Sequence, residues 1–297
     1  MSITLVYIIQ NHLANLKTHL QHHIELISKW KTSTCIIIDE SSNPDIKHYL
    51  SIHFPTIKYI KNSYIEGFVP SFEKAIKLCN TDYMLLLDPS TQMHYINYEN
   101  LKKILQSPTF FGACTAISNT TTTPATLNQL TWKMGRLLYQ NNSQHTQNKH
   151  NASLFISNAI FFHTKRLKLL TPLNQSYFTP QYCIFDIFFH ALKQGWTVHR
   201  FTDSIVTKTK NTHQYFSYHY ESNDLKRDEF SFIWLNTLSF QLLIQHIIAI
   251  LTILFGFKTK DLRVFLIQLI MGPFIIKKTT PFRWTMTTNK QILTPIK

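Results

Sequence analysis

The stretch that decides the fold is Cys35-Ile36-Ile37-Ile38-Asp39-Glu40-Ser41-Ser42, an apolar run that ends in acidic and hydroxyl side chains. A short apolar run closed by a polar turn is typical of a strand buried on both faces. Such strands occur in parallel sheets that are covered by helices on both sides. The stretch therefore predicts an α/β fold.

The same pattern recurs on both sides of this stretch. The other strand-like runs are residues 3–9, 57–60 and 83–87. The helix-like stretches between them are residues 15–30, 45–53 and 71–79. This alternation indicates parallel strands joined by right-handed crossovers. Since ligands collect at the carboxyl ends of such strands, Asp39 and Asp88 are candidate binding residues.

The second half of the chain carries a weaker pattern. Residues 118–151 are rich in Thr, Asn and Gln, and they predict a loop around one short helix near 130–139. Ordered structure is expected to return at 153–162. A helix is expected from Asp186 to Gln194, where Gly195 would stop it. Two short strands, 197–201 and 204–206, are expected to follow.

The charge balance is basic and uneven. The 297 residues hold 30 Lys and Arg against 16 Asp and Glu, a net charge of +14, and 44% are apolar, which excludes a disordered polyelectrolyte. Residues 258–297 hold eight Lys or Arg and one Asp, so 8 − 1 = +7 lies in this tail. No carboxylate stands between Glu99 and Asp186. Acid–base or metal chemistry must therefore use few acids.

The C-terminal region differs from the rest. Residues 230–257 carry no Asp, Glu, Lys or Arg and are long enough to span a bilayer. Thr237, Gln241, Gln245 and Thr252 fall on one helical stripe, so a helix lying in the interface is equally open. The basic residues that follow favour an anionic cytoplasmic leaflet. We expect a domain at 1–225 and membrane-associated helices at 226–297, with a buried helical hairpin as the alternative.

Several protein classes are disfavoured. No basic segment precedes the first apolar run, so we expect no signal peptide. The four widely spaced cysteines predict buried thiols in a reducing compartment. His22 and His23 are expected on the solvated face of an amphipathic helix. The positive charge gathers beside apolar segments rather than among exposed aromatic residues, so no nucleic-acid partner is expected.

Four motifs in this order resemble a family 2 glycosyltransferase with the GT-A fold, of the bacterial rhamnosyltransferase-like branch. The motifs, which span roughly residues 3–210, are Ile36-Ile37-Ile38-Asp39-Glu40-Ser41-Ser42, then Glu66-Gly67-Phe68 leading to Asp82-Tyr83-Met84-Leu85-Leu86-Leu87-Asp88-Pro89-Ser90-Thr91, then Ser157-Asn158-Ala159, and finally Asp186-Ile187-Phe188-Phe189-His190 with Gly195-Trp196. The resemblance implies a mixed sheet flanked by helices. It also implies transfer of a sugar from a nucleotide-diphosphate donor to a cell-surface glycan or a lipid-linked acceptor.

The resemblance also assigns residues. Asp39 would receive the nucleotide base, and Gly67 and Phe68 would contact the donor. Asp88, with Ser90 beside it, would hold a divalent metal, Mn²⁺ or Mg²⁺, or the diphosphate. The resemblance does not supply the base that an inverting transfer needs, and Asp186, one of the few acids on this side, is our candidate to deprotonate the acceptor hydroxyl. The enzyme would work at the cytoplasmic face of the inner membrane.

The sequence departs from the family pattern at two acidic positions. Ser90 stands where the family has a second metal-binding acid, and Cys183-Ile184 stand where it has an acidic pair. His163 and His190 are therefore further candidates for the base. The departures leave open a catalytically degenerate homologue that acts as a scaffold or a binding protein.

Overall fold

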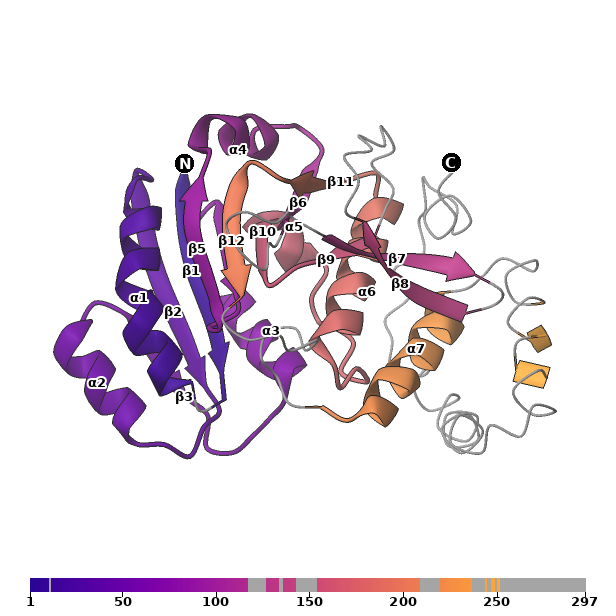
Figure 1. The fold of residues 1–297 in the computed structure, drawn as a ribbon, viewed down its shortest axis with the longest axis horizontal. Helices are drawn as coiled ribbons and strands as arrows, with labels where there is room; N and C mark the ends of the chain where they lie inside the picture. Colours follow the sequence, from indigo (N-terminus) through magenta and orange to yellow (C-terminus); the bar gives the residue numbers. More distant parts are fainter. Residues whose placement is uncertain are drawn as a thin grey trace.

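The computed structural model describes residues 1–10, 12–116, 127–133, 136–142, 154–208 and 220–236, together with residues 244, 247, 248, 250 and 251. In this part of the chain the main element is a sheet of seven strands in the order β11-β6-β10-β4-β1-β2-β3 (Figure 1). Its strands are β1 (Ser2–Ile9), β2 (Thr32–Asp39), β3 (Lys58–Lys61), β4 (Tyr83–Leu87), β6 (Phe110–Thr115), β10 (Ala159–His163) and β11 (Thr197–Phe201).

The sheet is mostly parallel, as the sequence predicts. Strand β1 pairs in parallel with both β2 and β4, β2 pairs in parallel with β3, and β11 pairs in parallel with β6. Only β10 among these strands runs the other way, antiparallel to β4 and β6. The carboxyl ends of β1, β2, β3 and β4 therefore meet at one edge of the sheet.

Side chains alternate between two apolar layers along each central strand. In β1, Val6 and Ile8 face one layer, while Leu5, Tyr7 and Ile9 face the other. The first layer is built with α3 (Phe68–Leu78), α5 (Thr164–Leu169), α6 (Pro180–Lys193) and α7 (Ser222–Asn236). The second is built with α1 (Leu13–Ser28), α2 (Asp45–His53) and α4 (Tyr98–Leu105).

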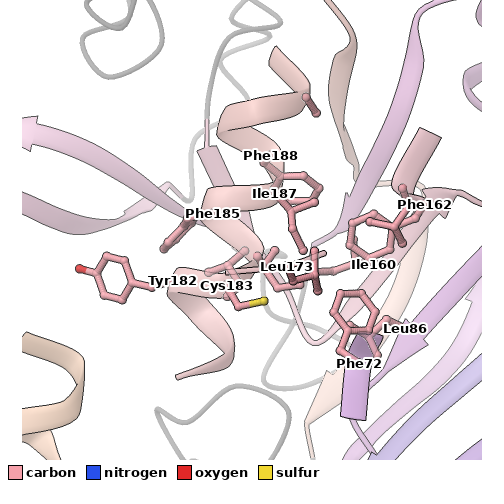
Figure 2. Close-up of a cluster of buried hydrophobic side chains, with 14 of the residues drawn as sticks. Phe72, Leu86, Ile160, Phe162, Leu173, Tyr182, Cys183, Phe185, Ile187 and Phe188 are labelled. Atoms are coloured by element: carbon pink, nitrogen blue, oxygen red, sulfur yellow. The ribbon is translucent and has the colours of Figure 1, made fainter. Parts of the chain in front are cut away.

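Helix α6 is the centre of the first layer. Of its 14 residues, 13 are buried, which is typical of a helix enclosed on all sides. Phe185 and Phe188 are fully buried. Figure 2 shows Phe188 on the side of Phe162, which comes from β10, and Phe185 on the other side of the helix beside Tyr182. The prediction that this helix begins at Asp186 is wrong, since it begins at Pro180, a residue well suited to the first helical turn.

Two small sheets lie beside the main one. One pairs β5 (Thr91–Ile96) with β12 (Ser204–Lys208), and the other holds β7 (Leu127–Lys133), β8 (Arg136–Asn142) and β9 (Leu154–Ile156). The helix predicted near 130–139 is therefore wrong. Lys133 pairs with Arg136 across a hairpin connection, which places Leu130 and Leu137 in the buried layer with α6. Burial of apolar side chains on the hairpin overrides the local helical pattern.

The C-terminal predictions are tested only in part. Helix α7 crosses residue 225, and Phe232 and Ile233 near its end are buried against α6, so the division into two domains stays a prediction. Among the described residues, no helix combines the length and apolarity that crossing a bilayer requires. Most of the predicted membrane-associated region, including 252–297, lies outside the described residues.

Histidines of α1 do not all face solvent. His23 is 1% exposed, so its predicted solvation is wrong. The backbone N–H of Met93 donates to Nε2 of His23 at 3.1 Å, which leaves the ring proton on Nδ1 to donate to the Tyr7 hydroxyl at 2.5 Å. Burial, followed by the neighbouring His19 and His22, lowers the pKa of His23 to about 3. The ring is therefore a neutral core group.

The four cysteines are buried and none forms a disulfide, which confirms the prediction of buried thiols. They lie in or beside strands and helices of the two apolar layers, as small apolar side chains.

The first prediction concerns Gly112 in β6. A Cβ atom at this position would lie 2.9 Å from a ring carbon of Phe188 and 3.2 Å from the backbone oxygen of Phe161. Because Phe188 is fully buried, Gly112→Ala should lower the free energy of unfolding by about 1–3 kcal/mol, as measured by urea denaturation. Phe188→Leu in the same chain should recover part of the loss, and an unchanged midpoint in Gly112→Ala would contradict the tight packing.

The second prediction concerns pH. Below pH ~6.5 the unfolded chain takes up a proton that buried His23 does not, so stability should fall by up to ~1.4 kcal/mol per pH unit. Relative to that of His23→Gln, the free energy of unfolding of the wild type should fall by about 2 kcal/mol between pH 7 and pH 5 in urea titrations. Asp228, whose pKa burial raises to about 7, titrates with the opposite sign but cancels in this difference. A pH-independent difference would contradict the burial of a neutral ring.

Candidate active site

The two candidate aspartates come together at the carboxyl edge of the sheet. Asp39 ends β2 and Asp88 follows β4, with β1 between them. Neighbouring strands lie about 4.8 Å apart, so the two residues stand about 10 Å apart along this edge. Both are fully buried.

Asp39 is held by partners on both oxygens. Oδ1 accepts the backbone N–H of Ser41 at 2.7 Å, and Oδ2 accepts the Tyr59 hydroxyl at 2.6 Å and the Lys61 ammonium at 3.2 Å. Burial and the bond to Asp39 raise the pKa of Tyr59. The Lys61 side chain is 38% exposed, so it is the member of this group that an incoming molecule can reach.

Glu40 is a site residue that the sequence reasoning missed. Its Oε1 accepts the backbone N–H of Gly67 at 3.1 Å and the Ser71 hydroxyl at 2.5 Å. Gly67 has a φ of 100°, a left-handed conformation that favours glycine, and it precedes α3 without a side-chain cap of its own. Glu40, which directly follows β2, thus accepts a backbone N–H at the start of α3. The signal available in the sequence was a second acid directly after Asp39.

Phe68 occupies a core position rather than the edge. It is 2% exposed, and its ring packs against Phe72 with a centroid distance of 5.5 Å. The structure therefore brings the backbone of Gly67 to the site but places the ring of Phe68 among apolar neighbours. Donor contact by Phe68 stays a prediction.

Asp88 begins a tight polar turn. Its Oδ1 accepts the backbone N–H and the hydroxyl of Ser90, each at 2.8 Å. The backbone N–H of Asp88 donates to the carbonyl of Asn158 at 2.8 Å, which ties the turn to the start of β10. Ser90 thus lies beside Asp88, as expected.

The residues around Asp88 suit a hard divalent cation. Among the described residues, no group of three or more His, Cys, Asp or Glu could hold a metal ion by itself. Thr91 Oγ1 and Asn158 Oδ1 are buried without a hydrogen-bond partner in this part of the chain. Mg²⁺ in proteins is commonly bound by one or two carboxylates together with substrate phosphates. Asp88 and these neutral oxygens therefore fit a cation that arrives with a diphosphate.

Asp186 lies in a different layer. It sits in the second turn of α6, and its Oδ1 accepts the Tyr177 hydroxyl at 3.0 Å and the amide of Asn236 at 2.8 Å. His190 Nε2 lies 3.7 Å from the same oxygen. No hydrogen bond or ion pair within the described ranges joins Asp186 to Asp39 or Asp88. Asp186 thus links α6, α7 and the segment before α6.

The histidine candidates are separated from one another. His163 ends β10 opposite Tyr83, at the amino end of β4 and away from Asp88. His190 lies on α6, one turn after Asp186. The structure therefore places His163 at the edge of the sheet opposite to the candidate site.

Asp228 is a second acid that the sequence reasoning missed. It is fully buried on α7 and accepts the backbone N–H groups of Phe178 and Thr179, at 3.0 and 2.7 Å, and the Thr179 hydroxyl at 2.7 Å. Since Thr179 precedes the first turn of α6, Asp228 caps that helix from a distant element. Its neighbour Glu229 binds Arg136 at 2.7 Å and so holds the hairpin β7–β8.

Comparison with known proteins supports the fold rather than a family. No protein-family model and no curated protein matches the sequence. Solved structures do match, among them GalNAc-T7 with UDP, GalNAc and Mn²⁺, at a TM-score of 0.59 and 12% identity. The mannosyltransferase PcManGT from Pyrobaculum calidifontis, with GDP-Man and Mn²⁺, matches at 0.53 and 10%. S. aureus TarS with UDP-GlcNAc matches at 0.51 and 11%.

These matches cover 79%, 78% and 79% of this chain but 48%, 61% and 66% of the three matched chains. The chain thus spans from just under half to about two thirds of the length of these glycosyltransferases. At identities of 10–12% the likeness concerns the fold, which is the GT-A type that the sequence motifs predict.

Proposed function

We propose that the protein is a glycosyltransferase that takes a sugar from a nucleoside-diphosphate donor. The observation that carries the proposal is the placement of Asp39 and Asp88 at the carboxyl edge of a GT-A sheet, with the single strand β1 between them. The structural neighbours were solved with UDP, GDP-Man and UDP-GlcNAc, which supports a donor of this class.

Different residues would bind different parts of the donor. Asp39 and Lys61 would receive the base, and the backbone at Gly67, held by Glu40, would line the approach. Asp88 and Ser90 would hold Mn²⁺ or Mg²⁺, which neutralises the leaving diphosphate when bound. In the transfer, the bond from the sugar to the diphosphate breaks and a bond to the acceptor oxygen forms. The acceptor hydroxyl gives its proton to a base.

Asp186 is the proposed base. Tyr177 and Asn236 both bind Oδ1, and none of these hydrogen bonds uses Oδ2. The hydrogen bonds would fix the carboxylate, and Oδ2 would accept the proton of the acceptor hydroxyl. Attack from the side opposite the leaving diphosphate would invert the sugar carbon.

The acceptor is proposed as a cell-surface glycan or a lipid-linked sugar, and the location as the cytoplasmic face of the inner membrane. The basic tail after residue 257 supports this location. So do four exposed apolar side chains at helical spacing, Ile244, Ile247, Ile248 and Leu251. The relation to the family 2 rhamnosyltransferase-like branch rests on the four sequence motifs.

A catalytically degenerate binding protein is the second candidate. The observation that favours it is the enclosure of Asp186, which is 9% exposed and bound by Tyr177 and Asn236. Ser90 also contributes no charge beside Asp88. A protein of this kind would bind the nucleotide sugar without transferring it.

Nucleotide binding tests the proposed donor site. Full-length protein should bind UDP or GDP more tightly with Mn²⁺ than with EDTA in calorimetry. Asp88→Asn should weaken the Mn²⁺-dependent binding about tenfold or more, because it removes the only anionic group proposed as a ligand of the cation. Asp203→Asn is the matched control, since Asp203 binds Asn100 in the turn between β11 and β12. Equal affinities in Asp88→Asn and wild type would contradict the site.

Turnover separates the two candidates. With UDP-GlcNAc or GDP-mannose and Mn²⁺, an active enzyme should release UDP or GDP. Asp186→Asn keeps an oxygen acceptor for Tyr177, so nucleotide affinity should stay unchanged while release falls about 10²-fold or more. Binding by wild type without release from any sugar donor would favour the degenerate candidate. Full release by Asp186→Asn would remove Asp186 as the base.

A further inference from the structure

The starting observation is a buried amide beside Asp88. Asn158 is 1% exposed, and its Oδ1 has no hydrogen-bond partner among the residues that the structure describes. Buried polar atoms in folded proteins are nearly always hydrogen-bonded, and an exception calls for a ligand, an ion or a water. Asn158 therefore needs an explanation that its own fold does not provide.

The register of the sheet puts this amide next to the aspartate. Ala159 pairs with Leu87 in the antiparallel ladder between β10 and β4, so the next pair along it is Asn158 with Asp88. The hydrogen bond from the N–H of Asp88 to the carbonyl of Asn158, at 2.8 Å, continues that ladder. Side chains directly opposite in such a ladder have Cβ atoms about 5 Å apart on one face of the sheet.

The backbone at Asn158 is held on both sides. The Ser157 hydroxyl donates to the carbonyl of Thr115 at 2.6 Å and accepts the N–H of Ala159 at 3.2 Å. Strand β9 ends at Ile156 and β10 begins at Ala159, so Asn158 lies in the short connection between two sheets. Asn158 thus presents its amide from a rigid support.

A second buried oxygen lies in the same turn. Thr91 is fully buried, and its Oγ1 also has no hydrogen-bond partner in the described part of the chain. Its backbone N–H donates to the carbonyl of Asp88 at 3.0 Å. Two neutral oxygens without partners among the described residues therefore belong to residues that backbone hydrogen bonds join to Asp88. Amide, hydroxyl and carboxylate oxygens are all ligands of hard cations.

We propose that Asn158 is a further oxygen ligand of the divalent cation that enters with the donor diphosphate, opposite Asp88. This inference rests on the proposed function and deepens it. Ser90 provides no charge at this turn, and the amide of Asn158 adds an oxygen from the opposite strand. The cation would then be held between β4 and β10 rather than by the turn after β4 alone.

The experiment uses full-length protein with Asn158→Ala and Asn158→Asp, and Asn100→Ala as the matched control on α4. Calorimetry measures UDP and GDP affinity in Mn²⁺ and in EDTA, electron paramagnetic resonance measures binding of Mn²⁺ alone, and thermal unfolding is followed in EDTA. Asn158→Ala should lose about tenfold of the Mn²⁺-dependent affinity and keep its affinity in EDTA. Asn158→Asp should bind Mn²⁺ alone more tightly than wild type.

The melting temperature separates a ligand from a structural residue. Because Asn158 Oδ1 makes no hydrogen bond in the described structure, Asn158→Ala should not melt below wild type in EDTA. A lower melting temperature, with equal loss of affinity in Mn²⁺ and EDTA, would overturn the inference. The inference would also be overturned if Asn158→Ala bound nucleotide as the Asn100→Ala control does while Asp88→Asn lost its Mn²⁺-dependent binding. That result would leave the proposed function unchanged. Absence of nucleotide binding by wild type would reject both.

Discussion

Burial of the central strands on both faces is the constraint on which the structure depends. Residues 3–9 of β1 lie between the layer of α1 and the layer of α3 and α6, with exposures of 0–2%. A strand enclosed in this way can present polar groups only at its ends. Because β1, β2 and β4 run in parallel, their polar ends collect at one edge, and this edge becomes the candidate site.

The sequence predicts the fold correctly where the pattern within a single helix or strand is enough to determine its structure. The apolar runs of β1, β2 and β4 and the helix at 45–53 are found where they were predicted. The hairpin β7–β8 could not be predicted locally, because Leu130 and Leu137 fit a helical stripe as well as a paired strand. Packing against α6 decides between them. The start of α6 was missed although Pro180 is typical of a first helical turn.

The candidate site, like the fold, was predictable only in part. Asp39 and Asp88 were found because strand ends are visible in the sequence. Glu40 is marked in the sequence only as a second acid after Asp39, and the helix starts that Glu40 and Asp228 cap lie 27 and about 50 residues away, so no local pattern shows what they bind. The position of Asn158 opposite Asp88 depends on an antiparallel strand inserted between parallel ones, a matter of topology. Tertiary contacts thus decide which polar residues join the two aspartates.

The most direct test of this account is a crystal structure of the full-length protein with Mn²⁺ and UDP or GDP. The account predicts an anomalous Mn²⁺ peak within about 2–2.6 Å of an Asp88 oxygen, with the diphosphate on the metal and the base beside Lys61. A nucleotide bound away from the carboxyl edge of β1, β2 and β4, or Mn²⁺ bound without contact to Asp88, would contradict it.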